Sequence, residues 1–220
     1  MKIIECEQGT PEWFSARLGK VTASRIADVV AKTKSSKDKE KPVYAAYRAN
    51  YAAELVVERM TGTTAERFKS AEMIWGSEKE PDARASYEFI TGATVATVGL
   101  VEHPAMSMAC ASPDGLVGDD GLVEIKCPNT ATHIDTLLNN SIADRYVKQM
   151  HWQMICTGRQ WCDFVSFDPR MPGDMQLFIQ RVPYDEALAR ELETEAWKFL
   201  AEVNDTIEKL NTKYRQEAAE

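Results

Sequence analysis

The sequence predicts an α/β domain with a central mixed β-sheet flanked by helices and a long helix near its C-terminal end. Three observations support this fold class. The chain has 220 residues, 44% hydrophobic and 27% charged, as expected for one buried core, and no linker divides residues 1–220. Strand-like segments gather in the centre, with helical segments on both sides. The final segment has helical periodicity over more than thirty residues.

Composition and charge narrow the class of protein. The chain has 26 basic and 34 acidic side chains, so its formal net charge is 26 − 34 = −8, the wrong sign for a general nucleic-acid binder. A DNA enzyme with this balance must gather its positive potential locally. We expect neither a signal peptide nor a membrane span, since no run of 18 apolar residues occurs. Five cysteines without a CxxC pair, and three histidines without zinc spacing, suit a reducing cytoplasm.

The first thirty residues predict one strand and two helices. Thr10 is a good helix N-cap, and the proline after it suits the first helical position. We expect this short helix to turn Trp13 and Phe14 inward and to leave Arg17 at its C-terminal edge. The elements expected here are an edge strand over 1–6, a helix from 10 to about 19, and a second helix from Thr22 or Ser24 through Val30.

A lysine-rich segment precedes the next helix. Residues 32–41 contain five lysines, two serines and no apolar residue. A solvated, mobile loop is the ordinary interpretation, and in an acidic protein the segment is also the obvious local patch for DNA phosphates. A helix follows over 44–60 and is closed by Gly62.

The centre of the chain predicts one more helix and three strands. Residues 77–82 lead into a helical run that ends at Gly92, and either Glu78 or Glu80 could simply be an acid near a helix N-terminus, favoured by the helix dipole. The apolar alternation then predicts strands over 93–102, 106–111 and 122–127.

The remaining third predicts three helices and two strands. Asn129 or Thr130 caps a helix through Leu138, and a second helix over 142–157 ends at Gly158. Strands follow over 161–167 and 175–182. The last helix spans 185 to about 218, roughly 50 Å. Its narrow apolar stripe predicts that it lies on the domain surface or packs against a neighbouring subunit; the stripe consists of Leu188, Leu192, Trp197, Leu200, Val203, Ile207 and Leu210.

The turn Ser112–Gly115 and the strand that follows it carry the chemistry. Side chains alternate across a strand, so Glu124 and Lys126 share one face, while Val123 and Ile125 share the other and face a core. The segment between turn and strand is rich in glycine and aspartate, which favour a hairpin. A hairpin brings Asp114 back beside Glu124.

Two carboxylates and an ammonium at the end of a β-ribbon suit Mg²⁺ and a phosphodiester. Mg²⁺ takes oxygen ligands, commonly one or two carboxylates with waters and substrate phosphate. Asp114 and Glu124 would supply carboxylate oxygens, and the backbone carbonyl of Ile125 a third. Lys126 would orient the attacking water or stabilise negative charge. Such a pattern arises by chance in roughly one chain in twenty, so a turn before an amphipathic strand is the alternative interpretation.

The wider sequence resembles the phage lambda exonuclease family. Pro113-Asp114, nine residues, then Glu124-x-Lys126 is the pattern of the PD-(D/E)xK nucleases. Further matches occur in order from residue 7 to about 170. They are Glu7–Gly9, Trp13, Arg17–Gly19, Thr22–Ser24, Trp75–Gly76, Ser107–Met108, Ser112–Leu116 and Glu124–Pro128.

The resemblance implies a restriction-endonuclease-like fold and a definite activity. The expected enzyme is a 5′→3′ exodeoxyribonuclease that uses one or two Mg²⁺ ions, with Mn²⁺ as a substitute. It acts processively on one strand of linear double-stranded DNA, releases mononucleotides and leaves a 3′ single strand for annealing-type recombination. The family also implies a homotrimeric ring around DNA, a single-strand annealing protein as partner, and a phage or prophage enzyme working in the bacterial cytoplasm.

The resemblance also assigns roles to residues outside the hairpin. Glu80 matches a carboxylate that lines the active site, where it would contact a second metal or its waters. Tyr146 and Gln149 match active-site positions on one helix face, and Gln153 on the same face is interpreted as surface or substrate contact.

Arg17 matches the arginine that anchors the 5′ phosphate. Its planar fork suits bidentate phosphate contact, and the hydroxyls of Thr22, Ser24 and Ser112 would fill the remaining acceptor positions. Without the resemblance, Arg17 reads as a solvated cation at a helix end.

Two other functions share these features. A PD-(D/E)xK endonuclease would use the same metal site on closed DNA. A non-catalytic DNA-end-binding module would keep the fold with an idle site, but the joint presence of Asp114, Glu124 and Lys126 argues against it.

Overall fold

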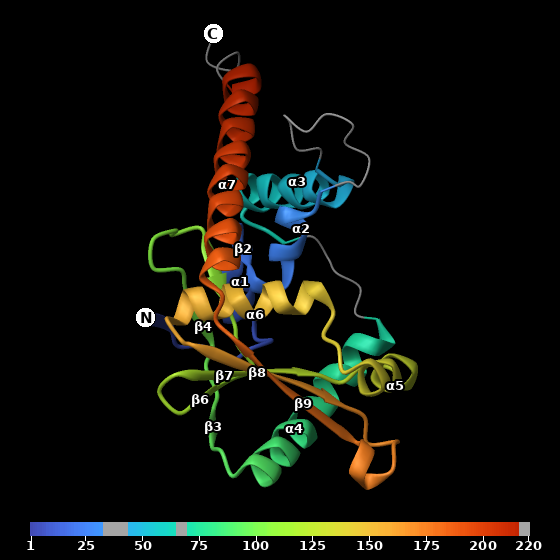
Figure 1. Ribbon diagram of the computed structural model, residues 1–220. Coiled ribbons are helices and arrows are strands. Elements are labelled where there is room, and N and C mark those ends of the chain that lie inside the picture. Colours follow the sequence, from blue (N-terminus) through green and yellow to red (C-terminus); the bar gives the residue numbers. More distant parts are fainter. Residues whose placement is uncertain (33–43, 65–69, 216–220) are drawn as a thin grey trace.

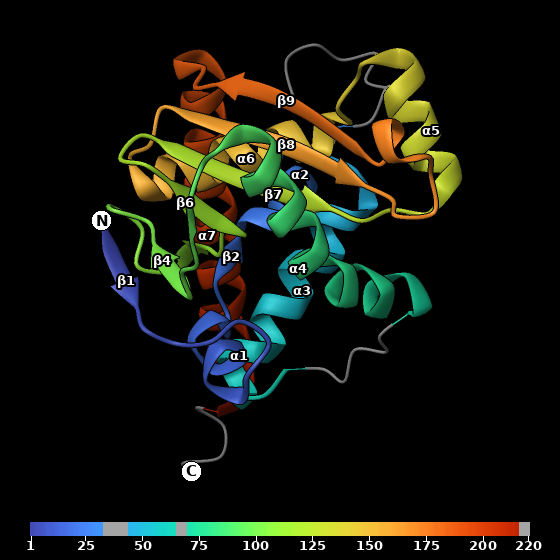
Figure 2. The ribbon, with the colours of Figure 1, turned by 90° about the horizontal axis from the view of Figure 1, so that it is seen from below.

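The strands of the chain form two mixed sheets rather than the single central sheet expected. The computed structural model describes residues 1–32, 44–64 and 70–215; the predicted lysine loop from residue 33 onward and the predicted helix end at 216–218 lie outside these residues. Helices pack around and between the sheets, and α7 extends away from them (Figures 1 and 2). The α/β class is therefore confirmed.

The smaller sheet has four strands. Its order is β1 (Lys2–Ile4), β4 (Leu100–Glu102), β5 (Ala109–Ala111) and β2 (Val21–Thr22). The first strand is an edge strand, as its position in the sequence predicted. The short β2 runs parallel to β5, while the other pairs are antiparallel.

The larger sheet has five strands and contains the hairpin. Its order is β3 (Val95–Ala96), β6 (Gly115–Val117), β7 (Gly121–Lys126), β8 (Trp161–Phe167) and β9 (Leu177–Pro183). Strands β7 and β8 are parallel and the other neighbours antiparallel. A parallel pair needs a crossover, and two helices between β7 and β8 in the sequence provide it.

Several helix boundaries have a local cause. Thr10, Ser70 and Asn129 accept backbone N–H groups as N-caps, and glycines with positive φ follow several C-terminal ends. The helical elements are α1 (Pro11–Arg17), η1 (Ala23–Arg25), α2 (Ile26–Val30), α3 (Ala46–Thr61), α4 (Ala71–Thr91), α5 (Thr130–Asn139), α6 (Asp144–Thr157), η2 (Gly173–Met175) and α7 (Glu186–Arg215).

Helices α4 and α6 cover opposite faces of the larger sheet. Ala83 and Tyr87 of α4 pack against Val123 on one face. Met150 and Met154 of α6 pack on the other face. The opposite side of α6 joins α2, α3 and α7 in the largest core cluster. Because α6 belongs to both cores, its position fixes the larger sheet relative to the rest of the chain.

Three expected element boundaries are wrong. The segment 93–102 holds two strands in different sheets, β3 and β4, since the chain leaves one sheet for the other. The helix expected from Thr22 or Ser24 is a short strand and a 3₁₀ turn before α2. Helix α4 begins at Ala71 and continues through Pro81, where the proline removes only one backbone donor.

Two expected core residues are exposed. Phe14 is 44% exposed and Trp197 is 52% exposed. In α7 the buried stripe passes through Ala196 and Phe199 instead of Trp197. Phe199 is fully buried and stacks on Tyr51 of α3 at a ring separation of 5.4 Å. The first half of α7 therefore packs into the core of its own chain.

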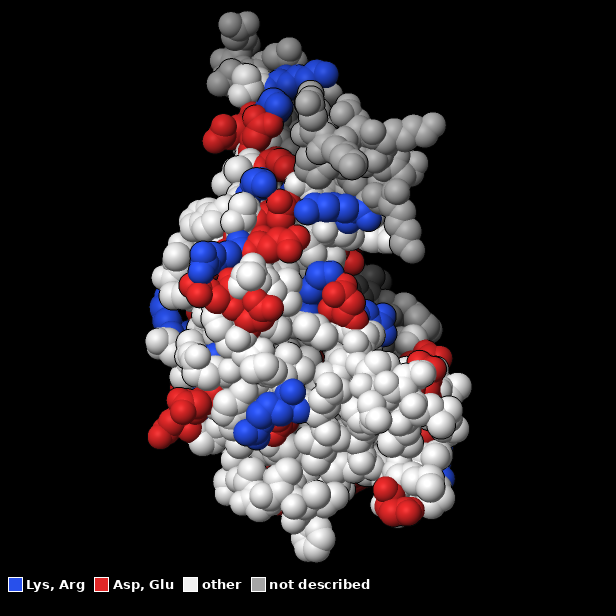
Figure 3. All heavy atoms as spheres, in the orientation of Figure 1, with Lys and Arg blue, Asp and Glu red and all other residues white. Residues whose placement is uncertain are grey.

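The surface carries both signs of charge. Figure 3 shows Lys, Arg, Asp and Glu side chains interspersed over the upper part of one face, along α7 and α3, while the lower part is largely uncharged. Among the residues described, none of the helices combines the length and apolar character needed to cross a bilayer.

Candidate active site

The β6–β7 hairpin brings Asp114 and Glu124 together. Gly115 pairs with Val123 in the antiparallel ladder, so the residues just outside that pair, Asp114 and Glu124, face each other across the hairpin. Asp114 Oδ2 accepts the N–H of Ile125 at 2.7 Å. This bond anchors the carboxylate on the neighbouring strand.

The strand alternation places Glu124 beneath α6. Val123 and Ile125 join the core cluster on the α4 side, as predicted, while Glu124 points toward α6 and is fully buried. Its Oε1 accepts Gln149 Nε2 at 2.6 Å and also contacts Lys126 Nζ. Its Oε2 accepts Gln153 Nε2 at 2.5 Å. Three donors therefore compensate a carboxylate that burial would otherwise destabilise.

Gln153 differs from its interpretation as a surface or substrate contact. Its side chain is fully buried, and its amide oxygen has no hydrogen-bond partner among the residues that the structure describes. It donates to Oε2 of Glu124, whereas Gln149 and the partly exposed Lys126 contact Oε1. The spacing of Gln149 and Gln153, one helical turn apart, was the available signal.

The charges of the hairpin are strongly coupled. Burial and the Glu124 carboxylate raise the pKa of Asp114 well above its usual range, against the opposing effect of Lys126. Burial opposes the charge on Lys126, but Glu124 and Asp114 outweigh it and raise the pKa of this ammonium. Lys126 therefore remains charged, whereas the neutral form of Asp114 is favoured.

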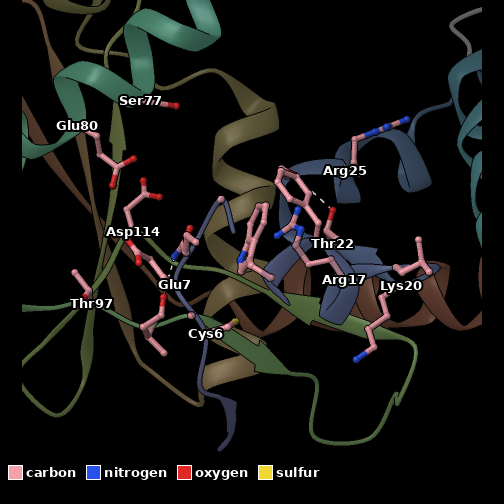
Figure 4. Close-up of a pocket in the computed structure, with 18 of the residues that line it drawn as sticks. Cys6, Glu7, Arg17, Lys20, Thr22, Arg25, Ser77, Glu80, Thr97 and Asp114 are labelled. Atoms are coloured by element: carbon pink, nitrogen blue, oxygen red, sulfur yellow. Dashed lines mark hydrogen bonds between the residues drawn. The ribbon is translucent and has the colours of Figure 1, made fainter. Parts of the chain in front are cut away.

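Glu80 faces this pair from α4. It lines the same cleft as Asp114, and its carboxylate adds to the raised pKa of Asp114; Figure 4 shows the two side chains turned toward one another. Arg84, one turn along α4, donates to Glu80 Oε1 at 2.6 Å. Glu78 is exposed, so Glu80 is the carboxylate of α4 at the site.

Tyr146 lies next to Lys126. The Lys126 ammonium is 5.4 Å from the Tyr146 ring centroid, and the ring stacks on Phe164 of β8 at 5.7 Å. Its hydroxyl accepts Arg145 Nη2 at 2.7 Å. Tyr146 and Gln149 thus reach the hairpin from the same face of α6, as the sequence spacing predicted.

Arg17 is held over the loop that carries Asp114. Its guanidinium stacks on the Trp13 ring at 4.0 Å and donates to Ser112 Oγ at 3.2 Å. The indole of Trp13 donates to the same hydroxyl at 2.9 Å. Because Ser112 precedes Asp114 by two residues, Arg17 is joined to the carboxylate loop and is not simply a solvated helix-end cation. The sequence predicts that Trp13 faces inward, but it does not predict the contact of Trp13 with Ser112.

A cleft of about 1210 Å³ is lined by Glu80 and Asp114 and also by Trp13 and Arg17. Figure 4 shows Glu80 and Asp114 on one side, and Arg17, Lys20 and Arg25 on the other. Thr22 and Ser24 also line the cleft, with their hydroxyls 3.4 Å apart. The lining carries both signs of charge, and the basic side chains that it gathers on one side are Arg17, Lys20 and Arg25.

The donor set fits a hard divalent cation. Asp114 and Glu124 offer carboxylate oxygens across the hairpin. Burial and then the Glu124 carboxylate raise the pKa of Asp114, so a bound cation would favour its ionised form. Within residues 1–32, 44–64 and 70–215, no three His, Cys, Asp or Glu side chains are arranged to hold a metal by themselves. A cation here would therefore take further oxygens from backbone, water and substrate.

Fold, site and comparisons together define a nuclease that acts on DNA. The model of the YqaJ-like viral recombinase domain matches residues 12–160, which include the hairpin and all of α6. The chain belongs to this family of lambda exonuclease-like proteins.

Solved structures agree with this family. The alkaline exonuclease LHK-Exo from Laribacter hongkongensis is 54% identical, with a TM-score of 0.86, covering 94% of this chain and 99% of that one. Its complex with dAMP gives 53% identity, a TM-score of 0.85 and the same coverage. A phage-related exonuclease from Haemophilus somnus 129PT is 16% identical over 87% of this chain and 96% of its own, with a TM-score of 0.70, and shares the fold. None of the curated proteins compared matches this chain.

Proposed function

We propose that the protein is a Mg²⁺-dependent 5′→3′ exodeoxyribonuclease acting on linear double-stranded DNA. The observation that carries this proposal is the cleft that Glu80 and Asp114 line at one side and Arg17 at the other. Glu124 pairs with Lys126 across the hairpin from Asp114, and Arg17 donates to Ser112 in the loop that leads to Asp114. A terminal phosphate at Arg17 and the next phosphodiester at Asp114 would define cleavage one nucleotide from an end. The related LHK-Exo has been crystallised with the mononucleotide dAMP, which supports a nucleotide-sized site.

The chain's own residues would divide the work. Asp114, Glu124 and the Ile125 carbonyl would hold one Mg²⁺, or Mn²⁺ in its place, with Glu80 beside a second ion or its waters. The bound ion would supply Lewis-acid stabilisation of the phosphoryl oxygens. Lys126, kept charged by its neighbours, would orient the attacking water or offset the charge that develops on phosphorus. Gln149 and Gln153 would hold Glu124 in place, and Tyr146 would lie beside the position of the attacking water.

The other side of the cleft would select the end. A terminal phosphate carries up to about one more negative charge than an internal phosphodiester, and the Arg17 fork can contact it in bidentate fashion. Trp13 holds this fork by stacking, and Ser112, Thr22 and Ser24 would supply hydroxyls. We therefore expect a preference for 5′-phosphorylated ends.

A digestion assay on matched substrates tests the activity. With Mg²⁺, linear duplex should release acid-soluble mononucleotides from its 5′ ends, while covalently closed circles should stay intact. Cleavage of closed circles would favour a PD-(D/E)xK endonuclease. An intact linear substrate, with binding to its ends retained, would favour a non-catalytic end-binding module.

A second assay tests the end pocket. Arg17→Ala should lower cleavage of 5′-phosphorylated duplex by roughly tenfold to a hundredfold, since a contact to a charged group contributes about 1.5–3 kcal/mol. Cleavage of 5′-hydroxyl duplex should change little. An unchanged ratio between the two substrates would return Arg17 to an ordinary helix-end cation.

The assembly and its partners are extended from the family resemblance. A homotrimeric ring around DNA would keep an acidic enzyme on its substrate, and a single-strand annealing protein would receive the 3′ strand in the cytoplasm of a bacterial host. Sedimentation of a stable monomer with distributive digestion would remove the ring and leave the chemistry standing.

A further inference from the structure

Helix α3 contacts the segment Gly19–Thr22 through three side chains from one helix face. Tyr51, Glu58 and Arg59 lie at i, i+7 and i+8, so they project toward the same neighbour. That neighbour is the turn between α1, which carries Arg17, and β2, which carries Thr22. None of the three is needed for the chemistry described above.

Side chains of α3 form hydrogen bonds with most of the backbone polar groups of this turn. Glu58 Oε2 accepts the N–H of Gly19 at 2.8 Å, and Arg59 Nε donates to the Gly19 carbonyl at 2.8 Å. The Tyr51 hydroxyl donates to the Lys20 carbonyl at 3.3 Å and accepts the N–H of Thr22 at 3.2 Å. Each side chain thus replaces a bond that regular secondary structure would otherwise supply.

The contact is also tight in space. Gly19 has φ of +68°, and a Cβ placed there would lie 2.7 Å from Arg59 Cγ. The N–H of Lys20 donates to the Arg17 carbonyl at 3.1 Å, so the backbone of Arg17 is part of the same turn. A shift of this turn would therefore move the Arg17 side chain relative to Ser112.

Two of these side chains, Tyr51 and Arg59, are themselves anchored on α7. Arg59 Nη1 donates to Asn204 Oδ1 at 2.7 Å, and the Tyr51 ring stacks on Phe199. Tyr51 and Glu58 lie in the wall of the cleft, but they are only 2% and 8% exposed. Little of either side chain is open to a direct contact with DNA, so we expect their main effect to pass through the turn they hold.

We propose that Tyr51, Glu58 and Arg59 are positioning residues that set the end-selecting pocket of Arg17, Thr22 and Ser112. The inference rests on the proposed recognition of a terminal 5′ phosphate and extends it to residues outside the cleft chemistry. The three side chains keep the turn at the position where the Arg17 fork meets Ser112. Without them the Arg17 guanidinium is no longer held at a fixed distance from Asp114. The preference for phosphorylated ends then decreases more than the rate of cleavage.

Tyr51→Phe is the sharpest test because it removes one hydroxyl and keeps the ring. The readout is the ratio of kcat/KM on 5′-phosphorylated over 5′-hydroxyl duplex. We expect the ratio to fall between about threefold and tenfold, the size of one or two lost hydrogen bonds. The loss should appear in KM on phosphorylated ends, while hydroxyl ends keep the wild-type values.

Tyr87→Phe is the matched control. It also removes a hydroxyl in contact with a buried partner, Asp163, at 2.9 Å, but on α4. It should lower the melting temperature and leave the ratio unchanged. If Tyr51→Phe lowers both substrates in parallel, so that its ratio equals that of the control, the role is merely structural and the proposal fails.

Two substitutions at Glu58 can be compared with each other, and a substitution at Arg59 is less prone to unfold the protein than one at Tyr51. Glu58→Gln keeps an acceptor for Gly19 and should hold the ratio, whereas Glu58→Leu should lower it. If Tyr51→Phe does not fold, Arg59→Met decides, since Arg59 is only partly buried. An unchanged ratio in Arg59→Met and Glu58→Leu would overturn the proposal.

Equilibrium binding separates this inference from the proposed nuclease activity. Fluorescence anisotropy with the same two duplexes, with Ca²⁺ in place of Mg²⁺, measures the preference without cleavage. A preference that Tyr51→Phe abolishes supports the positioning role even if no nucleotide is released. A wild-type protein that cleaves but binds both ends equally would overturn this inference and leave the nuclease assignment intact.

Discussion

At the scale of single residues, the candidate site gathers carboxylates that repel one another at the place where a cation would bind. Asp114 and Glu124 face each other at the hairpin, and Glu80 approaches from α4. Folding alone would favour neutral side chains here, since an ionised Asp114 with a raised pKa destabilises the native state at neutral pH. The residue types are explained by the chemistry they support and not by stability.

Neutral amide variants should separate these two demands. Asp114→Asn keeps an acceptor for the Ile125 N–H while it removes a charge, so its melting temperature should rise. Cleavage should fall by far more than tenfold, and DNA binding should persist because a negative charge beside phosphate is gone. Glu124→Gln should lose cleavage likewise. A variant that keeps more than about a tenth of the wild-type rate has lost less than about 1.4 kcal/mol of transition-state stabilisation, and this result would contradict the assignment.

Gln153 should matter through Glu124. Gln153→Leu removes the donor to the buried Glu124 Oε2, and an unsatisfied buried carboxylate oxygen costs about 1–3 kcal/mol. Urea unfolding should measure a loss of that size. Gln153→Glu should be worse, because it buries a second carboxylate beside the first. Equal stability of the wild type and the leucine variant would mean that water replaces the amide.

At the scale of elements, close packing at a glycine fixes the hairpin against the neighbouring strand β8. A Cβ on Gly121, the first residue of β7, would lie 2.1 Å from the Trp161 ring of β8. The Arg181 guanidinium stacks over the same ring at 3.5 Å, and Arg181 is itself paired with buried Asp163. The ring therefore contacts both the strand and the guanidinium.

Gly121→Ala should strain this packing. Inserting a methyl group into a filled space typically costs about 1–3 kcal/mol, so denaturant unfolding should show a loss in that range. Gly173→Ala is the matched control, because no atom lies within 4 Å of its added Cβ, and it should stay within about 0.5 kcal/mol of wild type. Equal effects of the two substitutions would mean that the Trp161 ring moves aside freely.

At the scale of the whole molecule, buried histidine joins several elements of the core. His103 Nδ1 accepts the N–H groups of Ala105 and Met106, both at 3.1 Å. Its ring lies 5.2 Å from that of Trp152 on α6, and its Nε2 is 3.2 Å from Glu193 on α7. Burial lowers the pKa of His103 to about 4.

Stability should therefore fall in mild acid. Unfolded histidine takes a proton near pH 6.5, while the folded ring resists it down to about pH 4, so the unfolded state binds more protons in this window. The free energy of unfolding should drop as pH falls from 6.5 to 4, by about 3 kcal/mol at most from this residue. His103→Asn, which keeps an acceptor, should show a flatter profile. Parallel profiles for both proteins would exclude His103 as the cause.

The sequence by itself determined the class of fold and the centre of the site. Strand alternation put Val123 and Ile125 into a core and Glu124 on the opposite face, and the glycine-rich turn returned Asp114 to it. Caps at Thr10 and Asn129 began helices where expected. These are local effects, carried by neighbours along the chain.

Tertiary structure decided what depends on contacts between distant segments. The division into two sheets, the buried Gln153 behind Glu124 and the exposure of Trp197 each follow from which surface packs against which. The same holds for Ser112 beneath Trp13 and Arg17, and for the hold of α3 on Gly19. Periodicity along one segment gives its faces, but the partner of each face is chosen by packing between segments, which no single stretch of sequence contains.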